Sequence, residues 1–242
     1  MDCLDPLPND AIGFAVLFEE GPCLVVSKPP GLLTQSPPGI DSLEVRVKSY
    51  LARRGSSGGS VYLGVPHRLD RPASGALLLA TSRAAARRLS AQFERRRVRK
   101  VYWVLVSGCV EPDRGDWEDW IRKVPGEPRA EIVLPGHPEG RPALLHYQVL
   151  ARAEWGTWLE IVLETGRTHQ IRLQAASRGH AVLGDAQYGS AVPFGPQYDD
   201  WRLRAVALHA RSVRFDHPAS RREVFVEAPL SDPWAEYVGK HL

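Results

Sequence analysis

Residues 75–108, GALLLATSRAAARRLSAQFERRRVRKVYWVLVSG, decide the fold class, because they join two strand patterns through one helical pattern. The first seven residues form an apolar run that predicts a buried strand. Thr81 or Ser82 is placed to cap a helix with apolar residues at every fourth position, ending near Arg97. The last ten residues are rich in β-branched and aromatic side chains and predict a second strand.

On either side of this stretch the chain adds mainly strands, with few helices between them. Such grouping favours an α+β fold, with a mixed, largely antiparallel sheet and flanking helices, over a doubly wound parallel fold. The whole chain, residues 1–242, is expected to form a single domain. The further predicted strands are 14–18, 23–28, 156–166, 203–215 and 222–228, and the further predicted helices begin near Leu43 and span about 168–178.

Composition describes an ordinary folded protein. Of 242 residues, 43% are hydrophobic and 24% charged, which excludes disordered, collagen-like and coiled-coil classes. The acidic, proline-containing start and the lack of any apolar run of about 20 residues predict a cytoplasmic protein without a membrane partner. Cys3, Cys23 and Cys109 are widely spaced and predict reduced thiols without a zinc site. Phosphate-binding glycine loops and metal-hydrolase motifs do not occur, so no cofactor or metal is expected.

Positive charge is concentrated between residues 83 and 100. Eight Lys or Arg stand there against one Glu, a net charge of +7 that exceeds the +3 of the whole chain. A solvated helix face is the ordinary reading of such a run. Because Tyr102 and Trp103 follow directly, the run also suits a phosphate backbone beside an unstacked base. The expected RNA contacts here are Arg95, Arg96, Arg97 and Lys100.

The segment GVPHRLDRPASG, residues 64–75, places one carboxylate among cations on a loop that enters a buried strand. Asp70 stands between Arg68 and Arg71 and close to His67. An aspartate beside guanidinium groups stays ionised and suits a nucleophile or an electrostatic stabiliser. The alternative is a structural ion pair.

The segment ETGRTHQIRLQAASR, residues 164–178, joins the end of a predicted strand to the start of a helix. Backbone N–H groups at such a junction, together with Arg167 and Arg172, are suited to bind an anion. The alternative is that these arginines lie at the start of the helix without binding an anion.

Taken together, HRLDRPASG, the Lys100-x-Tyr102 pattern and GRTHQIR resemble, in order and spacing, the motifs of the RluA-type family of pseudouridine synthases. SKPPGL, GDAQYG and ALHARSVRFDHP add further similarity, so the resemblance spans about residues 12–230. It implies the catalytic fold of that family, and we expect no separate N-terminal S4-type domain.

The resemblance implies roles for individual residues. Asp70 is similar to the catalytic aspartate, Tyr102 to the tyrosine that packs on the target base, and Arg172 to the basic residue paired with that aspartate. Arg68 resembles the arginine that fills the space left by a flipped base. The same motifs contain further expected RNA contacts: Arg71, Arg167 and His169.

The activity implied is the isomerisation of specific uridines in rRNA or tRNA to pseudouridine by a monomer that needs neither cofactor nor metal. Whether Asp70 attacks C1′, adds to C6 or assists a glycal route stays open, as do the particular RNA and uridine. Two alternatives also remain. One is a non-catalytic RNA-binding or ribosome-assembly protein on the same scaffold, and the other is a metal-independent phosphodiesterase using His67 and Asp70.

Overall fold

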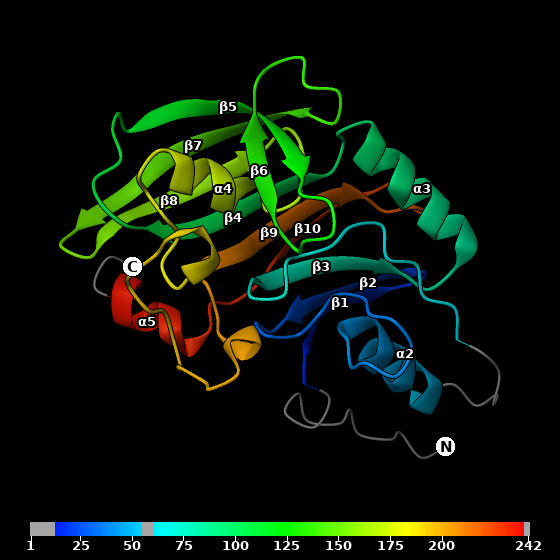
Figure 1. Cartoon of the computed structure of the whole chain (residues 1–242). Helices are drawn as coiled ribbons and strands as arrows, with labels where there is room; N and C mark the ends of the chain where they lie inside the picture. The colour runs from blue at the N-terminus through cyan, green and yellow to red at the C-terminus, as the bar shows by residue number, and fades with distance from the viewer. Residues whose placement is uncertain (1–12, 55–60, 240–242) are drawn as a thin grey trace. The chain divides into compact units, whose positions relative to one another are not determined.

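The computed structural model describes residues 13–54 and 61–239, which divide into two compact units (Figure 1). Among the described residues, unit 1 comprises 13–54, 61–98 and 212–229, and unit 2 comprises 99–211 and 230–239. The expectation of a single domain stays a prediction. The expectations about the N-terminal segment and Cys3 lie outside the described residues.

The strands of unit 1 pair antiparallel. β1 and β2 form the predicted hairpin, with Glu20 opposite Cys23, and β2 also pairs with β3. β9 pairs with β10, and the boundary between the two units falls within β9. The bounds are β1 (Ala15–Glu20), β2 (Cys23–Lys28), β3 (Ser74–Ala80), β9 (Leu208–Asp216) and β10 (Glu223–Glu227).

The described residues of unit 1 form two helices, α2 (Leu43–Arg54) and α3 (Arg83–Glu94). Ser82 caps α3, because its side chain accepts a hydrogen bond from the Ala85 N–H. The helix ends three residues before the predicted Arg97, since Arg96 adopts a left-handed backbone with φ of +55°. The apolar face of α3 packs on a core to which β2, β3, β9 and β10 contribute.

Unit 2 contains five antiparallel strands in the order β4, β8, β7, β5, β6. Two of them, β4 and β8, were predicted. The bounds are β4 (Arg99–Val106), β5 (Arg114–Lys123), β6 (Ala130–Val133), β7 (Arg141–Ala153) and β8 (Gly156–Leu163).

β5, β6 and β7 were not predicted from the sequence. In β5 the buried residues Trp117 and Ile121 stand four positions apart among charged residues such as Asp116, Glu118 and Arg122, which hides the strand signal. In β7 the alternation of buried Ala143, Leu145 and Tyr147 was a usable signal that went unread.

Helix α4 (Gln170–Ser177) follows β8 and lies against the β5 and β6 side of the unit 2 sheet (Figure 1). Its Leu173 packs on a small core of Ile121, Ala130 and Ala143. The C-terminal helix α5 (Asp232–Val238) buries Trp234 completely. These elements confirm the α+β class with a largely antiparallel sheet and flanking helices. None of the helices in the described part of the chain is long and apolar enough to span a membrane.

Candidate active site

The loop that carries Asp70 is anchored on both sides by residues 28–34, which we call the clamp. The Thr34 hydroxyl donates to the Leu69 carbonyl at 2.8 Å and accepts from the Leu69 N–H at 3.1 Å. On the other side of Asp70, the Nε of Arg71 donates to the Gly31 carbonyl at 2.9 Å. Hydrogen bonds to both neighbours therefore fix the backbone that displays the Asp70 carboxylate.

Lys28 begins the clamp and is fully buried. Its ammonium donates to the carbonyls of Pro29 and Leu32 at 2.8 Å each and to that of Arg71 at 3.1 Å. Burial lowers the pKa of Lys28 from 10.5 to about 7, although the nearby Asp70 carboxylate opposes this shift. No role for Lys28 was predicted from the sequence, although a lysine that ends an apolar strand before two prolines was a visible signal.

Replacing Lys28 with methionine is expected to weaken the pH dependence of stability. Between about pH 7 and 10.5 the unfolded chain holds a proton on Lys28 that the folded chain releases, so the free energy of unfolding rises with pH. From pH 7 to pH 9 this contribution is about 2 kcal/mol in the parent and absent in the variant. Urea unfolding of both proteins at the two pH values measures it. Equal changes with pH in parent and variant would contradict the assignment.

Around Asp70 the loop alternates between exposed and buried positions. Leu69 is buried, whereas Arg68 is exposed and Asp70 is half-buried. The Nε2 atom of His67 accepts a hydrogen bond from the Leu78 N–H at 2.9 Å, and its ring stacks on Phe93 at 4.6 Å. This use of His67 as a strand anchor favours a structural role over the acid–base role that the phosphodiesterase alternative requires.

In unit 2, strand register places Tyr102 on the sheet face that α4 covers. Tyr102 lies opposite Ile161, which lies opposite Tyr147. Ala143 shares the face of Tyr147 by alternation along β7, and Ala143 packs against Leu173 of α4. Tyr102 is only 5% exposed.

Arg172 is buried within α4 and is held by Asp185. Its Nε and Nη2 atoms donate to the two carboxylate oxygens at 2.6 and 2.8 Å, and both side chains are almost fully buried. Nη2 also donates to the Gln187 side chain at 2.9 Å. Pairing of Arg172 with Asp70 stays a prediction, because Asp70 belongs to unit 1. This contact of Asp185 was not predicted from the sequence, although Asp185 stands in the GDAQYG motif.

The start of α4 uses the other residues of GRTHQIR largely for structure. The Gln170 side chain accepts a hydrogen bond from the Arg167 N–H at 3.0 Å, and the Arg167 guanidinium donates to the Pro142 carbonyl at 2.9 Å. His169 adopts a left-handed backbone with φ of +52°, and its Nδ1 lies 2.9 Å from the Tyr188 hydroxyl. RNA contacts by Arg167 and His169 stay predictions.

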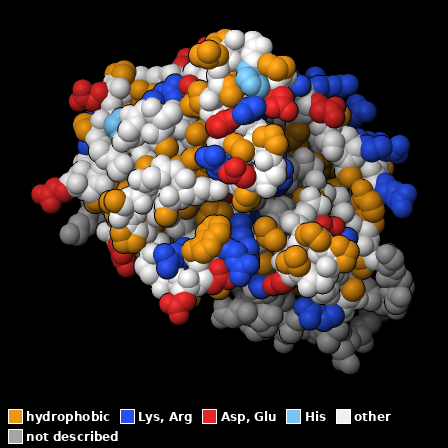
Figure 2. Space-filling model, in the orientation of Figure 1, with side chains coloured by type: hydrophobic (Ala, Val, Ile, Leu, Met, Phe, Trp, Pro, Cys, Tyr) orange, Lys and Arg blue, Asp and Glu red, His pale blue; other side chains and the backbone are white. Residues whose placement is uncertain are grey.

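The basic run lies on the surface of α3 and the turn after it, where Figure 2 shows Lys and Arg side chains gathered. Lys100 is half-buried, and its Nζ lies 5.8 Å from the centre of the Tyr102 ring. The described residues contain no group of three or more His, Cys, Asp or Glu placed to hold a metal ion. The exposed members of the basic run are Arg83, Arg87, Arg88, Arg95, Arg96, Arg97 and Arg99.

These features define an α+β class in which an antiparallel sheet with flanking helices carries an anchored aspartate loop and a buried arginine–carboxylate pair. The fold is similar to that of the solved structure "Human RNA Pseudouridylate Synthase Domain Containing 4", with a TM-score of 0.75 and 21% identity. That similarity covers 93% of this chain and 92% of the human chain.

The chain belongs to the RNA pseudouridylate synthase family, whose model matches residues 22–177, and within it to the RluA-type enzymes. It is 32% identical over 218 residues to an uncharacterized RNA pseudouridine synthase of Synechocystis sp.. It is 34% identical over 228 residues to ribosomal large subunit pseudouridine synthase D of Nitrosomonas europaea. These matches cover 89% and 93% of this chain but 65% and 64% of the relatives, so the chain spans about two thirds of their length.

Proposed function

We propose that this protein is an RNA pseudouridine synthase that isomerises specific uridines in rRNA or tRNA, with Asp70 as its catalytic aspartate. The observation that carries the proposal is the anchoring of the Asp70 loop. Both neighbours of Asp70 are hydrogen-bonded to the clamp, within the segment that matches the family. A reactive group held this way needs no reorganisation when the substrate binds.

The reaction breaks the N1–C1′ bond of uridine, turns the base and joins C5 to C1′. The proton at C5 is lost and N1 gains one, so atoms balance without an oxidant, a reductant or ATP. Asp70 supplies the carboxylate in each of the three routes, by attack on C1′, by addition to C6 or by assisting a glycal. The side chain of Tyr102 packs on the base, and Arg172 is the proposed basic partner of the aspartate.

RNA binding is assigned to the exposed arginine of the loop, Arg68, and to those of the turn after α3, Arg95, Arg96 and Arg97. A stacked uridine must be extruded before its C1′ can be reached, which costs a few kcal/mol. Arg68 is exposed beside Asp70 and fills the vacated space in this proposal. Arg71 and Lys100 complete the proposed contacts near the loop and near Tyr102, respectively. A cytoplasmic location and a monomeric state stay predictions.

Neutralising Arg95, Arg96 and Arg97 together with glutamine is expected to weaken the salt dependence of RNA binding. Each phosphate contact on single-stranded RNA contributes about −0.7 to the slope of log affinity against log salt. Loss of three contacts therefore makes the slope less negative by about 2. Filter binding between low and moderate salt measures the slope.

The control for this experiment replaces three surface arginines that are already paired with carboxylates: Arg46, Arg202 and Arg222. This control variant also removes three positive charges. Its slope of log affinity against log salt should stay closer to that of the parent than the slope of the Arg95, Arg96 and Arg97 variant does. An unchanged slope in the variant of Arg95, Arg96 and Arg97 would show that this part of the basic run does not contact RNA.

Catalysis is tested by tritium release from transcripts labelled at C5 of uridine, followed by mapping of the modified position. Release with a mapped pseudouridine supports the proposal. RNA binding without release from unmodified rRNA and tRNA transcripts supports the alternative, a non-catalytic RNA-binding or ribosome-assembly protein.

A further inference from the structure

Residues 185–188, which contain the short helix η1 (Ala186–Tyr188), join two parts of unit 2 through their side chains. Asp185 holds Arg172 of α4, as described above. The Gln187 side chain accepts from Arg172 and donates to the Pro128 carbonyl at 3.1 Å, just before β6. This segment therefore links the helix that carries Arg172 to the hairpin of β5 and β6.

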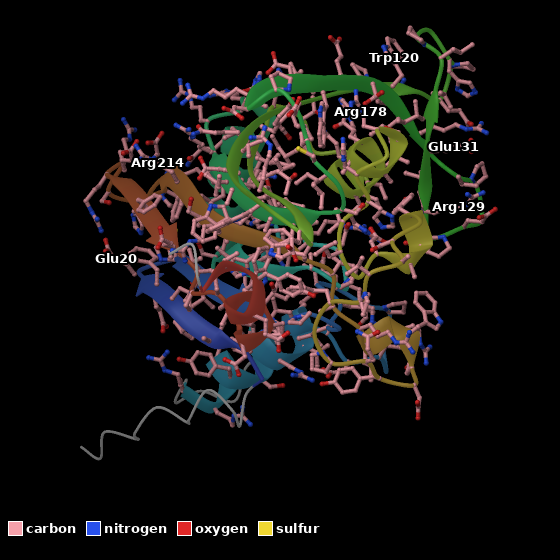
Figure 3. All side chains as sticks on the ribbon, turned by 90° about the vertical axis from the view of Figure 1, so that its left-hand side faces the viewer. Glu20, Trp120, Arg129, Glu131, Arg178 and Arg214 are labelled. Atoms are coloured by element: carbon pink, nitrogen blue, oxygen red, sulfur yellow. The ribbon has the colours of Figure 1, made fainter. Side chains whose placement is uncertain are left out.

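Tyr188 makes a further link between these two parts. Its hydroxyl accepts from the Ala130 N–H at 2.9 Å and lies 3.3 Å from the Ala130 carbonyl. The same oxygen lies 2.9 Å from Nδ1 of His169. A phenol has one donor and two lone pairs, so these three neighbours use its full hydrogen-bonding capacity. On either side of Ala130, Arg129 and Glu131 point away from the ribbon (Figure 3).

The ring of Tyr188 also supports Arg172. The guanidinium carbon lies 5.0 Å from the ring centre, within the range of a cation–π contact. The His169 ring meets the same tyrosine edge-on, with ring centres 5.7 Å apart and planes at 84°. Tyr188 thus contacts both Arg172 and His169 of the GRTHQIR segment.

We propose that Tyr188 is a positioning residue for Arg172, an inference that rests on the catalytic role proposed for Arg172. Asp185 accepts hydrogen bonds from Nε and Nη2 of Arg172, and these two bonds fix the position of the guanidinium within the guanidinium plane. The Tyr188 ring restrains the tilt of that plane. Anchoring of the Tyr188 hydroxyl at Ala130 and His169 keeps the ring in place, so the hydroxyl acts on Arg172 from a distance.

Removal of the hydroxyl alone tests this chain of contacts. Tyr188→Phe keeps the ring beneath Arg172 but loses all three polar contacts. The single-turnover rate at saturating protein is expected to fall about tenfold, while RNA affinity stays within about twofold of the parent. In an Arg172→Lys background the same substitution should change the rate by less than about twofold, because the planar guanidinium is already gone.

Tyr237→Phe is the matched control. The Tyr237 hydroxyl donates to the Pro193 carbonyl at 3.3 Å in the same unit, outside the residues discussed above. This variant is expected to keep the parent rate in both backgrounds. It therefore measures how far the loss of a tyrosine hydroxyl hydrogen bond elsewhere in unit 2 changes the single-turnover rate.

Two results would overturn the inference while the proposed function stands. One is a Tyr188→Phe variant whose single-turnover rate equals that of the parent. The other is a Tyr188→Phe substitution that lowers the rate equally in the parent and in the Arg172→Lys background, which would make Tyr188 a general stabiliser of the fold. If the parent converts no uridine in any transcript, the proposed function fails and the inference fails with it.

Discussion

Replacing Asp70 with asparagine is expected to abolish uridine conversion, with a loss of at least about 10³-fold in single-turnover rate. Asparagine keeps the size of the side chain and removes the charge and the nucleophilic oxygen. The hydrogen bonds of Leu69 and Arg71 that anchor the loop on both sides are left in place by this substitution, so the fold should persist. RNA affinity should be kept or slightly raised, because a charge that repels phosphate is lost.

The measurement is tritium release under single-turnover conditions, with filter binding of the same RNA. Asp41→Asn is the matched control, since Asp41 is an aspartate of unit 1 whose carboxylate pairs with Arg46 at the surface. The control should retain the parent rate. If Asp70→Asn also converts uridine at a comparable rate, Asp70 is a structural ion-pair residue and its proposed role is wrong.

Arg172→Ala is expected to reduce the single-turnover rate more than Arg172→Lys, and both should affect the rate more than RNA affinity. Lysine keeps the positive charge but lacks the planar fork that fixes a carboxylate through two hydrogen bonds. Alanine loses both properties. We expect losses of about 10-fold for lysine and about 10²-fold or more for alanine.

The alanine variant needs a stability control because Asp185 is almost fully buried. Removing its partner leaves a buried carboxylate without its guanidinium, which costs about 3–5 kcal/mol of folding free energy. Arg172→Ala combined with Asp185→Asn removes that orphaned charge. A folded double variant that stays as slow as Arg172→Ala shows that the rate loss comes from the arginine and not from misfolding.

A different result would reassign Arg172. Normal single-turnover rates at saturating protein, together with weakened RNA binding, would make it a phosphate contact. Asp70 would then lack its proposed basic partner.

Local patterns predicted much of the fold. The β1–β2 hairpin, β3, β4, β8 and the Ser82 cap of α3 follow from periodicity, turn residues and capping, which act over a few residues. β5 was missed because charged residues alternate with its buried side chains, and β7 was missed because Pro142 near its start argues against a strand despite the alternation of Ala143, Leu145 and Tyr147. Strand formation in such segments depends on the neighbouring strands that bury one face.

The motifs that carry Asp70, Tyr102 and Arg172 could likewise be identified from the order and spacing of residues along the chain. The sequence by itself therefore determined the fold class, the family resemblance and the candidate catalytic residues. It could not say which side chains hold them in place.

Only the tertiary structure decided those supporting contacts. The Thr34 hydroxyl meets Leu69 across 35 positions, the Lys28 ammonium meets the Arg71 carbonyl across 43, and Arg172 meets Asp185 across 13. A buried charge or polar group requires a partner, because its loss of hydration must be compensated. Which partner it receives depends on how separate strands and helices pack, and no spacing along the chain encodes that choice.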